Sequence, residues 1–247
     1  MRGVFKIGGS VVNKTPMPIW VDELKARILA HDQIVVVHGG GSLISRELEA
    51  RGEPVQFVQG QRVTSDRALT VVLSVLKGQV NGELVAYLAH QGISTVGISG
   101  IDLDLLQALP VSAPLGRVGK IQAVDLRLIE ALWQAAAVPV VAPLAGDGRG
   151  GILNVNGDVA AGALAGALRA DYLIYYTDSG GVRAVASDPT SIRLVLHQEE
   201  AERWIEDGTV SAGMIPKLRS GLFALDQGVS RVAIGAYRSG AGTELRR

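Results

Sequence analysis

Short apolar runs alternate along this chain with longer stretches in which apolar residues recur at helical spacing. Runs of β-branched residues, such as Gln33–Val37, are typical of strands that are covered on both faces. The pattern predicts strands over Gly3–Ile7, Gln33–Val37, Thr95–Ser99, Val138–Ala142, Tyr172–Tyr176 and Arg231–Gly235, the last being the final core strand. It predicts helices over Pro18–Ala30, Ser42–Arg51, Ala68–Gln91, Asp125–Ala136, Asp158–Leu168, Glu199–Asp207 and Pro216–Gln227.

Local signals refine these elements. We expect Ser42 to cap its helix, and Ala68–Gln91 to form either one helix or two that break at Gly78. Ile101–Ile121 contains prolines and glycines and is expected to be an irregular excursion such as a hairpin. Because strands and helices alternate throughout, the sequence predicts an α/β protein, an αβα sandwich with a central, mostly parallel sheet.

No low-complexity linker divides the 247 residues, so we expect one domain over 1–247 with a soft boundary near residue 145. Lys+Arg and Asp+Glu both number 24, and this balance disfavours a general binder of nucleic acid or of anionic membranes. The absence of cysteine excludes disulfides, thiolate metal sites and cysteine nucleophiles. No apolar run reaches about 18 residues, so no membrane span is expected, and we expect a cytoplasmic protein.

Two glycine clusters follow the first two predicted strands. They are Lys6-Ile7-Gly8-Gly9-Ser10 and His38-Gly39-Gly40-Gly41-Ser42. Glycine lets the backbone approach a ligand closely, and a following helix N-terminus favours an anion. Each cluster alone is equally consistent with a tight turn. Their position after neighbouring strands indicates a phosphate site, because open α/β sheets bind ligands at this edge.

Other chemical motifs are weaker. Gly116–Ile121 lacks the residues of a P-loop, and Gly146–Gly151 matches the dinucleotide pattern G-x-G-x-x-G without the helix that must follow it. No nucleophile elbow or zinc-like histidine spacing occurs. We expect His38 to be a satisfied structural residue, and His31, His90 and His197 to lie on the surface.

Three further segments place polar groups at turns. Arg62, in Gly60–Thr64, is either a surface residue or a carboxylate ligand. Asp158, in Asn154–Asp158, is at least a helix N-cap. Lys217 lies in the first turn of a helix, where the dipole disfavours a cation, so it is either solvated or bound to phosphate.

Together these segments resemble the amino acid kinase family, and within it the branch that phosphorylates N-acetyl-L-glutamate. The match follows the family's order over nearly the whole chain, at Lys6–Ser10, His38–Ser42, Gly60–Thr64, Val96–Gly100, Leu115–Gly119, Asn154–Asp158, Thr177–Val182, Gly213–Lys217 and Gly240–Thr243. The resemblance implies a carbamate kinase-like fold whose amino-terminal lobe, about 1–145, binds the acyl amino acid. It implies that about 146–247 binds the nucleotide, that ATP and Mg²⁺ are used, and that the enzyme is a homodimer.

The resemblance also implies roles for individual residues. Lys6 and Lys217 would stabilise the phosphoryl group in flight, and Asp158 would hold both lysines in place. Backbone N–H groups of Gly8, Gly9, Gly40 and Gly41 would contact the phosphoryl group, and Gly40 and Gly41 would also contact the acyl substrate. Arg62 and Asn154 would bind that substrate. The nucleotide would be lined by Thr177, Asp178, Ser179, Gly180, Gly181, Val182, Thr209, Val210 and Ser211, with no protein-held metal because Mg²⁺ arrives on the ATP phosphates.

The acceptor chemistry agrees with these residues. A side-chain carboxylate is ionised at neutral pH and needs no general base, so a catalytic histidine is not required. Lys120 and Ile101–Asp104 depart from the usual family pattern and leave open a carrier-protein-linked α-aminoadipate or glutamate as acceptor. Two other classes also stay open, a non-catalytic nucleotide-binding regulator and, from Gly146–Gly151 alone, a dinucleotide oxidoreductase.

Overall fold

The structure is a computed structural model that describes residues 1–8, 19–111, 114–235 and 242–247. It forms two compact units, one of Met1–Ile34 with Ala161–Arg247 and one of Val35–Ala160. These bounds differ from a single boundary near residue 145, because the amino-terminal strand pairs with a strand of the carboxy-terminal half. The assignment of one lobe to the acyl substrate and the other to the nucleotide stays a prediction.

The sheet of the first unit is built mostly from parallel strands. Its order is β12 (Val195–His197), β14 (Thr243–Arg246), β13 (Arg231–Ile234), β11 (Tyr172–Tyr176) and β1 (Arg2–Ile7). β1, β11 and β13 are parallel, whereas β14 runs antiparallel to β13. The prediction that β13 is the final core strand was therefore wrong. The four residues of β14 are too short for their alternation to stand out in the sequence.

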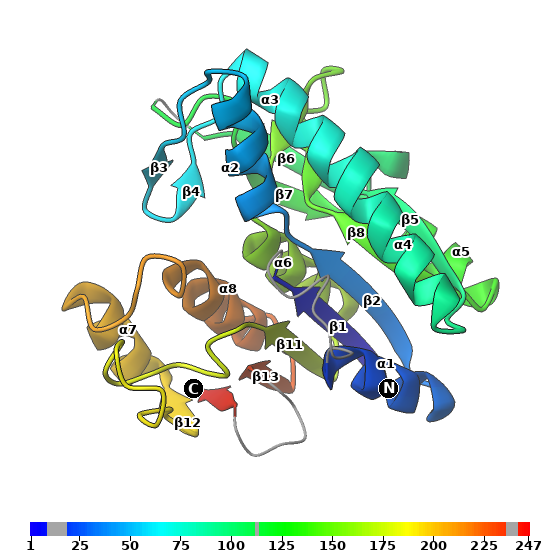
Figure 1. Cartoon of the computed structure of the whole chain (residues 1–247). Coiled ribbons are helices and arrows are strands. Elements are labelled where there is room, and N and C mark those ends of the chain that lie inside the picture. The colour runs from blue at the N-terminus through cyan, green and yellow to red at the C-terminus, as the bar shows by residue number, and fades with distance from the viewer. Residues whose placement is uncertain (9–18, 112–113, 236–241) are drawn as a thin grey trace. The chain divides into compact units, whose positions relative to one another are not determined.

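Among the described residues, the helices that accompany this sheet are α1 (Ile19–Leu29), α6 (Gly157–Leu168), α7 (Gln198–Glu206) and α8 (Ile215–Asp226). The chain enters the unit within α6. α8 packs against β11, β13 and β14 (Figure 1). A Cβ on Gly162 of α6 would lie 2.8 Å from the Ser220 carbonyl, so the small residues of α6 allow close packing against α8. α1 contributes a buried bond in which the Tyr176 hydroxyl donates to Glu23 Oε2 at 2.8 Å.

The sheet of the second unit contains β2 (Gln33–His38), β8 (Val138–Ala142) and β5 (Thr95–Ser99), all parallel. β8 is buried at every position, as its β-branched residues predict. A single helical stretch, visible in Figure 1, runs through α3 (Asp66–Leu73), η1 (Ser74–Val80) and α4 (Asn81–His90). Of the two predicted alternatives, the structure has the single helical stretch, since Gly78 lies inside the π-helical turn η1.

The other helices of this unit are α2 (Gly41–Ala50) and α5 (Arg127–Gln134). The expected Ser42 cap was wrong. Gly40 is the N-cap of α2 and no side chain caps the helix, so its first N–H groups are left to other partners. A core cluster that includes Ile44, Leu48, Val72 and Leu76 joins α2 to α3 and η1.

A second sheet in this unit has the order β10 (Ile152–Asn154), β9 (Leu144–Gly146), β6 (Leu106–Pro110) and β7 (Gly119–Val124). β6 and β7 form the antiparallel hairpin that the sequence predicted. Gly146–Gly151 joins β9 to β10, which are antiparallel, and therefore forms a hairpin turn and not a dinucleotide loop. A two-stranded ribbon, β3 (Phe57–Val58) with β4 (Gln61–Arg62), was not predicted.

A short turn after β5 is conformationally strained. The 3₁₀ turn η2 (Asp102–Asp104) contains Leu103 at φ 52° and Asp104 at φ 54°, in the left-handed region that disfavours side chains with a Cβ. Asp102 anchors the turn by accepting from the Ser99 N–H at 2.7 Å and from Lys77 Nζ at 2.5 Å. This turn belongs to Ile101–Asp104, the segment that departs from the pattern of the family that the sequence resembles.

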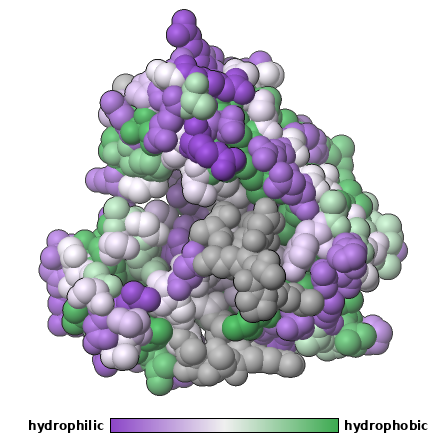
Figure 2. All heavy atoms as spheres, viewed as in Figure 1, coloured by the Kyte–Doolittle hydropathy of each residue, from purple (hydrophilic) through white to green (hydrophobic). Residues whose placement is uncertain are grey.

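Hydrophilic and hydrophobic residues are interspersed on the visible face in Figure 2. No helix in the described part of the chain is long and apolar enough to cross a membrane.

Candidate functional site

The second glycine cluster forms a loop between β2 and α2. Gly40 is buried, and a Cβ there would lie 2.8 Å from Leu76 Cδ2, so the close approach of η1 requires glycine. Gly41 begins α2, and a Cβ on it would meet open space. The N–H groups of Gly40 and Gly41 donate to no other described residue. The loop therefore offers two backbone donors at a helix N-terminus, an arrangement suited to an anion.

Arg62 is a buried cation fixed beside this loop. Its Nη2 donates to the Gly41 carbonyl at 2.8 Å and to Ser45 Oγ at 2.8 Å, and its guanidinium lies 4.6 Å from the centroid of the Phe57 ring. Arg62 Nη1 is buried and makes no hydrogen bond within the described residues. Burial lowers the pKa of the guanidinium, which nevertheless stays charged at neutral pH. A buried charge with an unused donor fits a carboxylate ligand, and the interpretation of Arg62 as a surface residue was wrong.

Asn154 is connected to Arg62 through a side chain that carried no predicted role. Asn154 Nδ2 donates to Thr64 Oγ1 at 3.0 Å, and this hydroxyl donates to the Arg62 carbonyl at 2.9 Å. Thr64 is fully buried, and its backbone N–H donates to the Leu115 carbonyl at 2.9 Å. The structure thus brings together Arg62 and Asn154, which are far apart in the sequence. Thr64 positions both, and only its place in the Gly60–Thr64 segment indicated it.

Asp158 lies in the first turn of α6 and is 4% exposed. Its interpretation as the N-cap was wrong, because the cap is Asn156. Asn156 Oδ1 accepts from the N–H of Asp158 at 2.8 Å and of Val159 at 3.4 Å. The side chain that caps α6 is therefore that of Asn156.

In the first unit, Lys6 lies on β1, the strand beside β11, and a buried hydrogen bond joins β11 to α8, the helix that carries Lys217. Lys6 is 6% exposed and pairs in register with Tyr175 on the neighbouring parallel strand, so both side chains point to the same face of the sheet. The Tyr175 hydroxyl lies 2.8 Å from Ser220 Oγ, one helical turn after Lys217 in α8. Lys217 Nζ donates to the Gly213 carbonyl at 3.1 Å. Lys6 thus points toward the helix that carries Lys217.

The first glycine cluster is described only in part. The N–H of Gly8 donates to the Tyr176 carbonyl at 3.3 Å, so this donor is already engaged in the sheet. Gly9 lies outside the described residues. Phosphoryl contacts from Gly8 and Gly9 stay predictions.

A cavity of about 150 Å³ brings the two predicted nucleotide segments together. It is lined by Ser179, Gly181, Val182, Arg183, Ala186, Thr209, Val210, Ser211 and Met214. Hydroxyl groups, one arginine and aliphatic side chains are the groups that can hold phosphate or ribose and a base. Thr177, Asp178 and Gly180 lie in the adjoining loop. Arg183, Ala186 and Met214 were not predicted.

The loop over this cavity is braced by turns and by β14. The Gly180 N–H donates to the Thr177 carbonyl at 3.3 Å, and Gly180 takes φ +72°, which glycine adopts without strain. The Val182 N–H donates to Oγ1 of the fully buried Thr243 at 2.8 Å. Asp207 accepts from Thr209 Oγ1 at 2.6 Å, and this bond and one from the Thr209 N–H lower the pKa of the Asp207 carboxyl.

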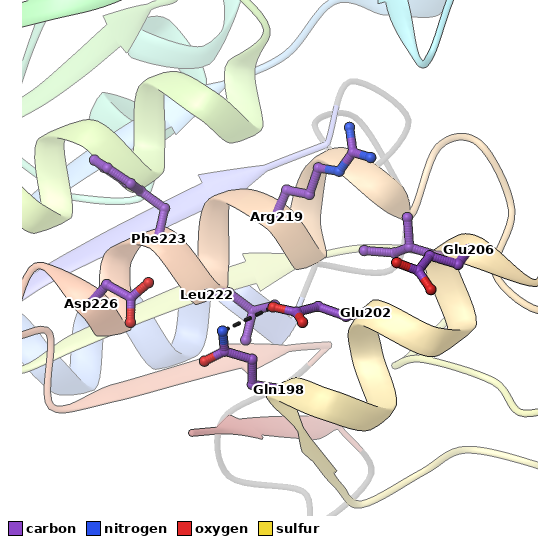
Figure 3. Close-up of a pocket in the computed structure, with 8 residues that line it drawn as sticks. Gln198, Glu202, Glu206, Arg219, Leu222, Phe223 and Asp226 are labelled. Atoms are coloured by element: carbon purple, nitrogen blue, oxygen red, sulfur yellow. Dashed lines mark hydrogen bonds between the residues drawn. The ribbon is translucent and has the colours of Figure 1, made fainter.

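A second cavity of about 320 Å³ lies between α7 and α8 (Figure 3). Its lining includes three carboxylates, from Glu202, Glu206 and Asp226, and one cation, Arg219. Gln198 donates to Glu202 at 2.9 Å across one turn of α7, as Figure 3 shows. This acidic lining would repel the phosphates of a nucleoside triphosphate, so the smaller cavity is the better nucleotide site in this unit.

The histidines and carboxylates define no metal site among the described residues, where no group of three such side chains could hold an ion. His31, His90 and His197 are exposed, as expected. His38 is fully buried, with Nδ1 3.1 Å from the Gly39 carbonyl and Nε2 3.1 Å from Asn81 Nδ2, which confirms a satisfied histidine.

Comparison with known proteins agrees with these features. The model of the amino acid kinase family matches residues 1–236. An acetylglutamate kinase from Methanopyrus kandleri is 41% identical over 94% of this chain and 93% of its own length. This chain belongs to the amino acid kinase family.

Solved structures show the same family fold. The structure of smu.665 from Streptococcus mutans UA159 matches with a TM-score of 0.90 and 29% identity, covering 98% of both chains. Giardia carbamate kinase matches with a TM-score of 0.64 over 100% of this chain and 98% of its own, at 15% identity, which shows the fold alone. The predicted carbamate kinase-like fold and the family recognised from the motifs are therefore confirmed. Members of this family are kinases, so ATP is the expected phosphoryl donor.

Proposed function

We propose that this protein is an acetylglutamate kinase, which transfers the γ-phosphoryl group of ATP to the side-chain carboxylate of N-acetyl-L-glutamate in arginine biosynthesis. The observation that carries the proposal is Arg62. Its guanidinium is buried, is bonded to the Gly41 carbonyl, and keeps one unused donor beside the glycine loop. That donor suits the α-carboxylate of an amino acid, which would leave the side-chain carboxylate directed to the loop.

The reaction requires alignment and charge neutralisation. Both reactants are anionic, and the attacking carboxylate is already ionised, so no general base is needed. The N–H groups of Gly40 and Gly41 can donate hydrogen bonds to the oxygens of the transferred phosphoryl group and stabilise their negative charge. Lys6 and Lys217 are the proposed cations, and Asp158 is their proposed orienting carboxylate. Asn154, which is fixed by Thr64, binds the polar groups of the acyl substrate.

The nucleotide is proposed to occupy the cavity between Ser179–Arg183 and Thr209–Ser211. Mg²⁺ is proposed to enter as part of the MgATP substrate. Bound in this way, the ion neutralises charge on the β- and γ-phosphates. A homodimer and a cytoplasmic location also belong to this proposal.

The test is acyl phosphate formation by the purified protein. With MgATP and N-acetyl-L-glutamate, hydroxylamine should trap a hydroxamate, and omission of either substrate should abolish it. Free glutamate, aspartate and carbamate serve as competing acceptors and should give little product. Turnover with a carrier-linked α-aminoadipate and none with N-acetyl-L-glutamate would overturn the proposed acceptor.

The catalytic assignment needs a separate variant. Lys217→Ala should lower kcat by about 10²-fold or more, as for removal of one electrostatic donor, with folding verified by cooperative unfolding. Arg219→Ala, two residues later in α8, is the matched control and should keep the wild-type rate. ATP binding without turnover in the wild-type protein would instead indicate a non-catalytic nucleotide-binding regulator.

A further inference from the structure

His38 is a buried histidine immediately before the glycine loop. It ends β2, has no exposed surface, and is bonded at both ring nitrogens. Nδ1 lies 3.1 Å from the carbonyl oxygen of Gly39, and Nε2 lies 3.1 Å from Asn81 Nδ2. The proposed phosphoryl transfer gives this ring no direct role, although it contacts the loop that supplies the donors.

The partners of Asn81 determine which ring nitrogen carries the proton. Asn81 Nδ2 also lies 2.9 Å from the Val140 carbonyl and 3.4 Å from the Ile98 carbonyl, and a nitrogen that faces carbonyl oxygens must donate. His38 Nε2 must then accept, while Nδ1, which faces a carbonyl, must donate. His38 is therefore a neutral imidazole protonated at Nδ1.

The backbone around Asn81 is shaped for this bond. Asn81 is 5% exposed and begins α4 directly after the π-helical turn η1. A Cβ on Gly97 of β5 would lie 2.1 Å from Asn81 Oδ1, so only glycine at this position leaves room for the amide. The π-helical turn η1 that precedes Asn81 also contains Leu76, against which Gly40 packs.

The bond to the Gly39 carbonyl fixes a peptide plane. In a trans peptide the C=O of one residue and the N–H of the next point in opposite directions. When the Gly39 oxygen is held toward the His38 ring, the N–H of Gly40 points away from it. That N–H donates to no other described residue, although Gly40 is buried.

We infer that Asn81 and His38 form a positioning relay, which holds the Gly39–Gly40 peptide so that the Gly40 N–H is directed at the phosphoryl group in flight. His38 and Asn81 are positioning residues, because neither contacts the substrate in this arrangement. The inference rests on the proposed function for the identity of the anion, and on the structure alone for the relay. Two flanking glycines would otherwise let this peptide rotate, since glycine restricts the backbone least.

The relay itself is tested by NMR without any turnover. In ¹⁵N-labelled protein, long-range ¹H–¹⁵N spectra should show His38 protonated at Nδ1 and unprotonated at Nε2. Gly97→Ala, which displaces Asn81 without touching His38, should change this tautomer signature. Gly82→Ala is the matched control, because a Cβ there meets no atom within 4 Å, and it should leave the signature intact. Protonation at Nε2 in the wild-type protein would overturn the relay.

Kinetics test the consequence for catalysis. His38→Leu removes the donor, and His38→Asn keeps an N–H near the position of Nδ1. We expect His38→Leu to lower kcat about 10- to 100-fold, less than the roughly 10²- to 10³-fold cost of deleting such a donor outright, with KM for both substrates within about twofold. His38→Asn should recover part of kcat, and Gly97→Ala should lower it while Gly82→Ala does not.

Two results would contradict the inference. One is an unchanged kcat in a folded His38→Leu protein, or in Gly97→Ala if His38→Leu does not fold. The other is a loss of stability in His38→Leu with kcat intact per folded molecule, since a purely structural histidine behaves in this way. Absence of wild-type turnover with N-acetyl-L-glutamate would overturn the proposed acceptor, and the NMR result would still decide the relay.

Discussion

Arg62 Nη2 donates to the carbonyl oxygen of Gly41 across 2.8 Å, so the cation proposed for the substrate carboxylate and the loop proposed for the phosphoryl group are one rigid piece. The bond uses one side of the guanidinium, and Nη1 is left for a ligand. A lysine at this position cannot bind both the Gly41 carbonyl and a substrate carboxylate, because its ammonium lacks the planar, forked geometry of a guanidinium.

We therefore expect Arg62→Lys to raise KM for N-acetyl-L-glutamate about 10- to 100-fold, the equivalent of one charged hydrogen bond. KM for ATP should change little. Steady-state kinetics with each substrate varied in turn would measure this, and Arg67→Lys is the control, since Arg67 is exposed and pairs with Glu53. Equal rises in both KM values would contradict a substrate-specific role for Arg62.

The Thr243 hydroxyl is expected to affect the binding of ATP and not that of the acyl substrate. Thr243→Val removes the hydroxyl that accepts from the Val182 N–H and leaves that buried donor unsatisfied, at a cost of about 1–3 kcal/mol. Because Val182 lines the proposed nucleotide cavity, we expect KM for ATP to rise several-fold with KM for the acyl substrate unchanged. Thr190→Val removes an exposed hydroxyl that donates to Asp188 and should leave both values as in the wild type.

Leu103 offers a test of backbone strain. A leucine at φ 52° costs about 1–2 kcal/mol, more than the 0.5–1 kcal/mol that the added chain entropy of glycine costs. Leu103→Gly should therefore raise the free energy of unfolding by about 0.5 kcal/mol in urea titrations. Leu109→Gly, at a similarly exposed leucine in the strand β6, should lower it by about 0.5–1 kcal/mol. Equal destabilisation by both changes would show that Leu103 is not strained.

Tyr176 is expected to make the protein less stable at alkaline pH. Burial, assisted by the nearby Glu23 carboxylate, raises the pKa of Tyr176 far above its usual value near 10. Above pH 10 the unfolded chain loses this proton and the folded chain keeps it, so the free energy of unfolding falls by about 1.4 kcal/mol per pH unit. Below pH 10 the same group adds no pH dependence.

Tyr176→Phe removes this contribution. The variant should have a lower free energy of unfolding than the wild type at pH 8, because the bond to Glu23 is lost. The difference in free energy of unfolding between the two proteins should become smaller between pH 10 and 11. Urea unfolding of both proteins at these pH values would measure it, and the other buried tyrosines are common to both. A difference that stays constant across this range would contradict the raised pKa.

The longer elements follow from local pattern, and the short ones do not. β8 and α8 are predicted within a residue or two, because their apolar periodicity extends over several positions. β14 and each strand of the ribbon of β3 with β4 have four residues or fewer, and so few residues carry no clear alternation of apolar and polar positions. No local signal in so few residues separates them from loops.

The same distinction holds for the candidate site. The glycines of the loop are visible in the sequence, because their composition is unusual. The burial of Arg62 cannot be seen in the sequence, since it depends on Phe57 and on a carbonyl of α2 that comes 21 residues earlier. Asn81 carries a weak signal, an amide within an apolar helical stretch, and its contacts with His38 and Val140 come from separate strands.

The pairing of β1 with β11 limits when the first unit can be completed during synthesis. Residues Val35–Ala160 form a contiguous unit and can become compact as soon as they emerge. The unit of Met1–Ile34 with Ala161–Arg247 cannot be completed so early, because β1 pairs with Tyr172–Tyr176, which are synthesised much later. Late ribosomal pausing would therefore prolong the exposure of this incomplete unit to chaperones and proteases.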